Sequence, residues 1–320
     1  MRVAAVIPHW NRAELLAPLL AQLNLQIRRF DEIIVVDNGS TDGSAEVAEQ
    51  AGVRVIRLHR NYGFAAAVNR GIAATDADWI AILNNDVTLD PAWLDRLLAV
   101  SDAGAVWFAT GKILSARDHS ILDGTWDEIS RGACAMRCGS GLPDGPFWNQ
   151  RRSIRMTSMT ACLIRRQAFI DLGPLDERFE SYLEDVDFGL RCAKASLGGI
   201  YEPAAVAYHQ GSSTWGAWST DTVRLVSRNQ VLLTAKHFRG QPVWPILAGQ
   251  LLWGLVALRH GCWWAWFQGK LGGWKMAAQI EDETGDSEGF AALIRSSEAE
   301  ILSRPRGLYW RLYSWLTTTR

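Results

Sequence analysis

Residues 79–86 read Trp-Ile-Ala-Ile-Leu-Asn-Asn-Asp, an apolar run that stops at two amides and one carboxylate. Such a run indicates a strand buried on both faces of a sheet, with its polar end at the strand terminus. The βαβαβαβ order of the first 86 residues predicts an α/β fold with a Rossmann-like, mainly parallel sheet flanked by helices. The other strands are expected at Val3–Ile7, Glu32–Val36 and Val53–Leu58, and the helices at Leu15–Leu25, Ser44–Gln50 and Phe64–Ala74.

The rest of the chain extends this pattern and then changes character. Residues 111–155 show little periodicity and predict a variable loop region with a few strands. Gly and Pro between residues 238 and 242 indicate a boundary, so we expect an α/β domain over residues 1–240 and a helical, Trp-rich C-terminal extension over residues 241–320. Between the loop region and this boundary, the pattern predicts strands at Met156–Ile164 and Ile200–Ala207. It predicts helices at Arg166–Leu172, Glu184–Ala195 and Asp221–His237.

Composition narrows the class of protein. The 320 residues are 48% hydrophobic and carry a formal net charge of −1, so there is material for a large core and no basic field that would attract nucleic acid. The five cysteines form no CxxC pair and indicate reduced thiols in the cytoplasm. The short apolar start is interrupted at Pro8, which argues against a signal peptide.

The C-terminal extension has the composition of a membrane-surface segment. Val243–Phe267 is apolar and contains five tryptophans, but Pro245, Gln250 and Arg259 interrupt it, whereas a membrane span needs ~20 predominantly apolar residues. Tryptophans and basic residues favour the membrane–water boundary. We therefore expect a cytoplasmic protein, peripheral at the inner face of the cell membrane; the alternative is a hydrophobic helical hairpin packed on the preceding domain.

The predicted strand ends favour a nucleotide as ligand. Ligands of parallel sheets bind beyond the carboxyl ends of the strands. No G-x-G-x-x-G follows the first strand, which argues against a dinucleotide; Pro8 and Asn11 shape that turn instead. Asp37 follows the second strand, where its carboxylate can accept hydrogen bonds from a base N–H or a ribose hydroxyl.

The segment from residue 60 to 71 combines a basic residue, a helix start and polar side chains. Asn61 and Asn69 lie two helical turns apart, and the helix N-terminus can help to hold phosphate. Asn61, and Asp42 or Ser40 before the preceding helix, can equally serve as starting caps.

Asn84, Asn85 and Asp86 indicate a site for a diphosphate and a cation. A departing diphosphate develops negative charge that a divalent cation held by a carboxylate can neutralise, and Mg²⁺ or Mn²⁺ suits Asp86 together with diphosphate oxygens and water. Asn84 can bond ribose but adds no charge. His209, just past the last predicted strand, is a possible further metal ligand.

Four acids gather around the start of the predicted helix at Glu184, namely Glu180, Glu184, Asp185 and Asp187. Acidic residues favour the first turn of a helix by ~0.3 to 1 kcal/mol, but four exceed what capping requires. A carboxylate among them that faces an acceptor hydroxyl would act as a general base.

Taken together, residues 2–240 resemble glycosyltransferase family 2, the inverting nucleotide-sugar enzymes of the GT-A fold. Within it the chain is similar to the rhamnosyltransferase-like branch, which builds surface polysaccharides. The resemblance rests on the order and spacing of Ile7-Pro8-His9-Trp10-Asn11-Arg12, Val36-Asp37-Asn38-Gly39-Ser40-Thr41-Asp42-Gly43, Asn61-Tyr62-Gly63-Phe64 with Asn69-Arg70-Gly71, Leu83-Asn84-Asn85-Asp86, Leu175-Asp176-Glu177-Arg178-Phe179, Glu184-Asp185-Val186-Asp187 and His209-Gln210-Gly211-Ser212-Ser213.

The resemblance implies a role for each motif. Asp185 would be the catalytic base, and Asp86 and His209 would bind Mg²⁺ or Mn²⁺, with Asn84 in place of the first acid of the family's D-x-D element. Glu184 would lie at the acceptor. Independently of the resemblance, Trp126, Arg131 and Trp148 of the loop region are candidate residues of the acceptor wall. The donor-binding set would be Pro8, Asn11, Asp37, Asn38, Asn61, Phe64, Asn69, Asn84, Asn85 and Asp86.

The expected reaction is one displacement with inversion, because a single base needs no covalent intermediate. The preferred donor by resemblance is dTDP-L-rhamnose, with UDP-hexoses behind it, and the acceptor is a hydroxyl of a glycan or lipid-linked glycan. Two other functions compete with this one. A sugar-phosphate nucleotidyltransferase would favour a glycine-rich basic loop after the first strand, which is missing. A non-catalytic carbohydrate-binding module would use some of the 16 tryptophans, but many of these lie after residue 240.

Overall fold

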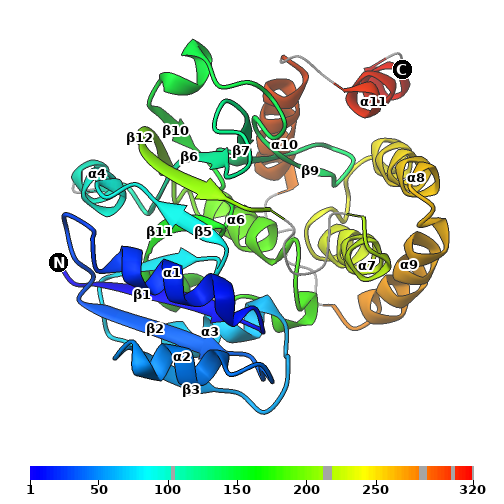
Figure 1. The fold of residues 1–320 in the computed structure, drawn as a ribbon. Coiled ribbons are helices and arrows are strands. Elements are labelled where there is room, and N and C mark those ends of the chain that lie inside the picture. Colours follow the sequence, from blue (N-terminus) through cyan, green and yellow to red (C-terminus); the bar gives the residue numbers. More distant parts are fainter. Residues whose placement is uncertain (102–104, 212–217, 281–286, 304–306, 319–320) are drawn as a thin grey trace. The chain divides into compact units, whose positions relative to one another are not determined.

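The computed structural model describes residues 1–101, 105–211, 218–280, 287–303 and 307–318 (Figure 1). The chain forms two compact units. We call Met1–Trp126 with Arg137–Thr214 the sheet unit, and Asp127–Met136 with Trp215–Arg320 the helical unit. This division differs from the predicted boundary near residue 240, because the helix before that boundary packs with the helices after it.

The sheet unit is built on one mixed sheet whose path runs β10-β12-β6-β11-β4-β1-β2-β3, with β5 paired to β12 and β7 paired to β6. The β4-β1-β2-β3 half is parallel, as predicted. The other half departs from this because β11 runs antiparallel to both β4 and β6. The strands are β1 Val3–His9, β2 Glu32–Asp37, β3 Arg54–Arg57, β4 Trp79–Leu83, β5 Val87–Leu89, β6 Phe108–Ser115, β7 Leu122–Gly124, β10 Arg152–Ile154, β11 Ala161–Arg165 and β12 Gly199–His209.

Helices cover both faces of this sheet, as the unbroken apolar strands require. Alternate residues of β1 divide the core: Val3 and Ile7 pack with α1 and α4, whereas Ala4 and Val6 pack with the opposite layer of α3, α5 and α6. The helices of this unit are α1 Ala13–Leu23, α2 Ser44–Gln50, α3 Phe64–Ala73, α4 Trp93–Ser101, α5 Arg166–Leu172 and α6 Glu184–Lys194, with short 3₁₀ turns η1 Pro146–Asn149 and η2 Glu177–Phe179.

α2 and α3 begin at the predicted residues, but their N-cap residues differ from the prediction. Both helices begin after a glycine, Gly43 and Gly63, whose φ angles of 84° and 90° suit a residue without a Cβ. Asp42 still serves α2, because its Oδ1 accepts from the N–H of Ser44 at 3.1 Å. Asn61 makes no such contact with α3; its Oδ1 accepts from Gly63 N–H instead.

The N–H groups at the head of α3 are used within the protein. Phe64 N–H donates to Ser181 Oγ at 3.1 Å, and Ala65 N–H donates to the carbonyl of Glu180 at 2.9 Å. A Cβ at Gly63 would lie 2.6 Å from that carbonyl oxygen. The expectation that this helix end helps to hold phosphate is therefore not met by these two donors.

The helical unit contains a two-stranded sheet and five helices within the described residues. α9 packs on α7 and α8, and α8 packs on α11 (Figure 1). No helix in the described ranges has the length and apolar content to cross a membrane. The elements are β8 Asp127–Ile129, β9 Ala135–Arg137, α7 Thr220–His237, α8 Val243–Arg259, α9 Trp263–Ala277, α10 Ser287–Leu302 and α11 Leu308–Thr318.

Candidate active site

Asp86 and His209 are brought together by the pairing of two strands. β5 begins one residue after Asp86 and runs antiparallel to the end of β12, with Val87 opposite His209. His209 Nε2 lies 3.1 Å from Asp86 Oδ1, and the N–H of Gln210 donates to the carbonyl of Asp86. Both side chains are buried. The strand register thus places a carboxylate and an imidazole side by side at the edge where ligands of such sheets bind.

A second carboxylate, Asp123, faces the other nitrogen of His209. Its Oδ2 lies 2.8 Å from His209 Nδ1 and 3.6 Å from Nη1 of Arg137. Burial alone would lower the pKa of His209, but the hydrogen bonds to Asp123 and Asp86 raise it to about 9. Burial likewise opposes ionisation of Asp123, and the bond to His209 lowers its pKa nonetheless. The imidazolium is therefore held between two carboxylates.

Glu184 and Asp185 are the first two residues of α6, and the surroundings of their carboxyl groups differ from those of Asp123. Burial raises the pKa of Glu184 well above its usual range, and the adjacent charge of Asp185 adds to the shift. Burial also raises the pKa of Asp185, while the positive charge of Arg137 opposes the rise. Within the described residues Glu184 Oε2 has no hydrogen-bond partner. These acids take up protons more readily than ordinary carboxylates do, which suits proton transfer near neutral pH.

The backbone before α6 is unusual for residues with side chains. Glu180, Tyr182 and Leu183 all have positive φ angles, of 58°, 72° and 68°. Such conformations cost on the order of 1 kcal/mol or more each and persist only where the surroundings enforce them. The head of α6 is therefore a constrained position.

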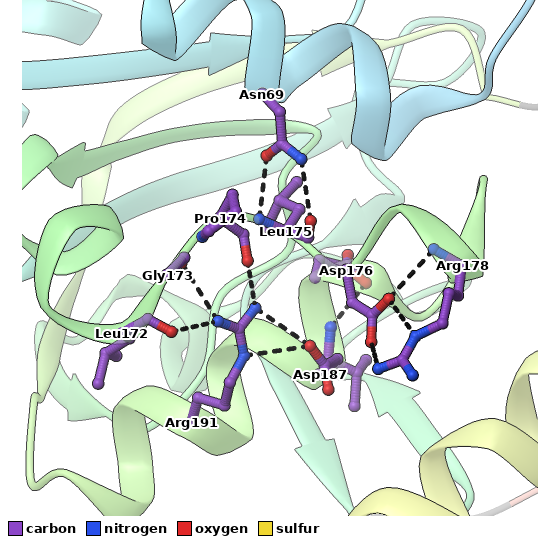
Figure 2. Close-up of polar contacts among 11 residues, drawn as sticks. Asn69, Leu172, Gly173, Pro174, Leu175, Asp176, Arg178, Asp187 and Arg191 are labelled. Carbon is purple, nitrogen blue, oxygen red and sulfur yellow. Dashed lines mark hydrogen bonds and ion pairs between the residues drawn. The ribbon is translucent and has the colours of Figure 1, made fainter. Parts of the chain in front are cut away.

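Figure 2 shows polar contacts that hold α6 and η2 to the neighbouring turns. The Arg191 guanidinium pairs with the fully buried Asp187 at 3.1 Å and donates to the carbonyls of Leu172, Gly173 and Pro174. Asp187, one of the four acids noted in the sequence, is thus committed to holding α6 against the preceding turn. Asp176 does the same for η2, because it accepts from the backbone and the guanidinium of Arg178.

Asn38 ties together the loops after β2 and β3. Its Nδ2 donates to Asn61 Oδ1 and to the carbonyl of Gly63, both at 3.0 Å, and its Oδ1 accepts from the N–H of Tyr62. The Asn38 amide is used within the protein, as is Asn61 Oδ1. These two residues therefore shape the loop rim.

Asp37 lies at this same rim, buried at the end of β2, with its Oδ1 near the N–H of Ser40. His9 at the end of β1 is paired in register with Asp37. Its Nδ1 lies 2.9 Å from Asn85 Nδ2, and Nε2 has no partner among the described residues. Burial lowers the pKa of His9 to about 4 against the opposing charge of Asp37. A neutral imidazole therefore orients Asn85.

The remaining donor-side residues lie at the same strand ends. Asn11 has a φ of 55°, and its Oδ1 accepts from the N–H of Thr41, which joins the first loop to the second. Pro8 pairs in β1, Phe64 starts α3, and Asn84 follows β4 with its N–H bonded to the carbonyl of Thr160.

Four predicted residues have structural positions instead. Asn69 is buried and exchanges hydrogen bonds with the backbone of Leu175, as Figure 2 shows. Trp126 and Trp148, 1% and 6% exposed, lie in one core cluster and cannot line an acceptor groove there. Arg131 belongs to the helical unit, where it pairs with Glu298 at 2.7 Å. Ser212 and Ser213 of the last motif lie outside the described residues.

Sequence reasoning did not identify Asp123, Arg137 or His9 as site residues. The first two come from residues 111–155, where periodicity gave no element to which they could be assigned. His9 stands inside the first motif, and its place at a strand end was a usable signal.

Known proteins with a similar sequence are glycosyltransferases. The family description "Glycosyl transferase family 2" matches residues 4–173. The N-acetylglucosaminyl-diphospho-decaprenol L-rhamnosyltransferase of Mycobacterium tuberculosis is 33% identical over 239 residues, which cover 65% of this chain and 74% of the relative.

Two solved structures share the fold at low identity. A mannosyltransferase from Pyrobaculum calidifontis, in complex with GDP-Man and Mn²⁺, matches with a TM-score of 0.56 and 16% identity, over 98% of this chain and 84% of that one. A second crystal structure, with UDP, GalNAc and Mn²⁺, matches with a TM-score of 0.66 and 13% identity, over 95% of this chain and 58% of that one.

Proposed function

Because the chain belongs to glycosyltransferase family 2 and is an inverting glycosyltransferase of the GT-A fold, we propose that it glycosylates a lipid-linked glycan from a nucleoside-diphosphate sugar. The preferred donor is dTDP-L-rhamnose. The support for both substrates is the 33% identical relative, whose name describes L-rhamnosyl transfer to a diphospho-decaprenol acceptor. The family assignment sets aside the nucleotidyltransferase and the carbohydrate-binding module.

In this proposal the donor nucleotide occupies the ends of β1, β2 and β4. Asp37 accepts hydrogen bonds from the base or ribose, Asn84 bonds ribose, and Asn85 meets the diphosphate with its amide oriented by His9. Asn11, Asn38 and Asn61 hold the loops in shape, with Pro8 and Phe64 as part of the wall. Asn69, Trp126 and Trp148 stay structural.

Asp86 and His209 suit a divalent cation whose shell is completed by the donor. Asp86 Oδ1 and His209 Nε2, 3.1 Å apart, would hold one ion once that ion displaces the Nε2 proton, and Mg²⁺ or Mn²⁺ would take its remaining ligands from diphosphate oxygens and water. Within the described part of the chain no three His, Cys, Asp or Glu side chains form a complete metal site. When bound, such a cation neutralises charge on the departing diphosphate.

Asp185 acts as the base in this proposal. It removes the proton from an acceptor hydroxyl, whose oxygen attacks the anomeric carbon as the bond to the diphosphate breaks on the opposite face. Burial disfavours the ionised form of Glu184 more strongly than that of Asp185, so in this proposal Glu184 donates a hydrogen bond to the acceptor and leaves the charge to Asp185. The raised pKa of Asp185 at a rigid helix head is the observation that carries this mechanism.

A direct test compares donors and then the stereochemistry of the product. The purified protein is incubated with dTDP-L-rhamnose, UDP-glucose and GDP-mannose and with a short-chain prenyl diphosphate GlcNAc acceptor. We expect transfer from dTDP-L-rhamnose, and an anomeric configuration in the product opposite to that in the donor by NMR. Retention of configuration would contradict the single displacement, and transfer from another donor alone would replace the preferred sugar.

We also propose that the helical unit meets the bilayer that carries the acceptor. Its helices α8, α9 and α11 contain no aspartate or glutamate and carry exposed Arg259, Lys275 and Arg311, which complement anionic head groups. Large apolar side chains are exposed along the same helices at spacings of three and four: Val243, Leu247, Leu251, Leu255 and Leu258 on α8, Trp264, Phe267, Leu271 and Trp274 on α9, and Leu308, Leu312 and Trp315 on α11.

Vesicle flotation tests this membrane proposal. We expect binding to vesicles rich in phosphatidylglycerol, weaker binding to phosphatidylcholine alone, and loss of binding in Leu251→Asp. Ile170→Asp is the matched control, because Ile170 on α5 has the same exposed fraction of 56% as Leu251 but lies in the sheet unit. Equal vesicle binding by the two variants would refute a bilayer contact through α8.

A further inference from the structure

His209 is held from both sides of its ring. Asp86 Oδ1 lies 3.1 Å from Nε2, and Asp123 Oδ2 lies 2.8 Å from Nδ1. The ring is almost fully buried, so these carboxylates replace water as its partners. A neutral imidazole has one N–H and one lone pair, and the hydrogen bond at one nitrogen decides which nitrogen is left to bind a cation.

Asp123 is placed for this contact by an irregularity in the sheet. β7 pairs with β6 through Leu122 opposite Leu114 and Gly124 opposite Ile113, so Asp123 is the extra residue of a β-bulge. Bulges turn a side chain away from the direction that regular pairing would give it. The other edge of β6 pairs with β12, where Ser115 lies opposite His209. The bulge therefore brings a carboxylate from β7 to the histidine of β12.

Arg137 also lies close to the carboxylate of Asp123. Its Nη1 lies 3.6 Å from Asp123 Oδ2, and its charge also acts on Asp185. A Cβ at Gly124 would lie 2.2 Å from Arg137 Cδ, so only a glycine lets the arginine side chain cross β7 at this point. Gly211 leaves similar room, because a Cβ there would come within 3.3 Å of Asp123 Oδ1.

We propose that Asp123 is a positioning residue that accepts the Nδ1–H of His209 and so directs the Nε2 lone pair to a divalent cation shared with Asp86. This inference rests on the proposed function, which places the cation there. Carboxylates behind metal-binding histidines commonly fix the ring and its tautomer in this way, and their loss weakens metal affinity about 10- to 100-fold. Asp123 is not a ligand of that ion in this proposal, because it contacts Nδ1 whereas Asp86 contacts Nε2.

The test measures Mn²⁺ directly and does not depend on turnover. Free Mn²⁺ is titrated by EPR with protein and dTDP, and electron spin echo modulation reports whether an imidazole nitrogen is bound. We expect the nitrogen signal in the wild type and its loss, with about 10-fold or weaker Mn²⁺ affinity, in Asp123→Leu. Asp123→Asn, whose amide oxygen can still accept from Nδ1, should lie between the two.

Asp118→Asn is the matched control. Asp118 is an acid of the same β6–β7 connection, but its carboxylate accepts hydrogen bonds from Ser120 rather than from His209. Circular dichroism establishes that each variant is folded. Wild-type affinity and nitrogen signal in folded Asp123→Leu and Asp123→Asn would overturn the positioning role. A wild-type protein without any nitrogen signal would instead refute the cation site of the proposed function.

Discussion

Carboxylates gather at the end of β12 and at the head of α6 in the sheet unit, yet the two regions shift the pKa values of these carboxylates in opposite directions. At β12 the hydrogen bond to His209 lowers the pKa of Asp123 in spite of burial. At α6 burial raises the pKa of both Glu184 and Asp185. The imidazolium of His209 thus divides the acids of the site into two groups. Asp86 and Asp123 keep their charge and suit a metal site, whereas Glu184 and Asp185 can exchange protons.

The largest effect should come from removing the proton acceptor at α6. Asp185→Asn keeps nearly the same shape but has no basic oxygen, so we expect sugar transfer to fall about 10³-fold or more while binding of dTDP is unchanged. Initial rates and calorimetry measure the two quantities. Sugar transfer at the wild-type rate in Asp185→Asn would show that Asp185 is not the catalytic base, and the contrast between α6 and β12 would then have no role in catalysis.

The charge of His209 between Asp86 and Asp123 can be tested through the folding stability of the metal-free protein. The pKa of His209 is about 9 in the folded state against 6.5 for an ordinary histidine, so its protonation stabilises the fold below pH 6.5, and this contribution, at most about 3 kcal/mol, is lost as the pH rises to 9. Urea unfolding at pH 6 and pH 9 should show this decline in the wild type and less of it in His209→Gln. Parallel pH curves for the two proteins would show that His209 is not held as an imidazolium.

Asp86 sharpens the comparison from the ligand side. Asp86→Ala should weaken dTDP binding in Mn²⁺ about 10-fold or more and leave binding in EDTA nearly unaltered, because the carboxylate acts on the nucleotide through the cation. Calorimetric titrations in both buffers measure the difference. An equal loss with and without Mn²⁺ would assign Asp86 a direct contact with the nucleotide.

Glu184 should give the smallest effect. Because burial and the charge of Asp185 both disfavour the ionised form of Glu184, Glu184→Gln should retain transfer within about threefold, with the acidic limb of the kcat/KM profile unmoved. That limb should rise with pH through the raised pKa of Asp185 in both proteins. A shift of the limb by a full pH unit in the variant would mean that Glu184 shares the titration.

The parallel half of the fold was predictable because local pattern determines it. The first four strands and three helices lie within two residues of their predicted bounds, and α2 and α5 match them. The antiparallel insertion of β11 and the strands between residues 111 and 155 were not predictable. β7, β8, β9 and β10 have three residues each, which carry too little periodicity, and the direction of β11 depends on distant partners.

The site divides in the same way. Residues at strand ends, such as Asp86 and His209, follow from knowing where the strands stop, and the structure does bring these two together. Asp123 depends on a bulge that no local signal announces. Asn69, Trp126 and Trp148 show the limit of local pattern, because a polar or aromatic residue in a promising stretch can still be buried.

The hydrogen bonds at the head of α3 bear on how substrates exchange. Glu180 and Ser181, which lead into α6, take the N–H groups of Ala65 and Phe64, and Gly63 lets the two backbones touch. Swinging this segment outward would strip two donors of their partners at about 1–3 kcal/mol each. These contacts hold the segment that leads to Asp185 against α3, and we expect any opening that admits the lipid or releases the spent nucleotide to occur elsewhere along the rim.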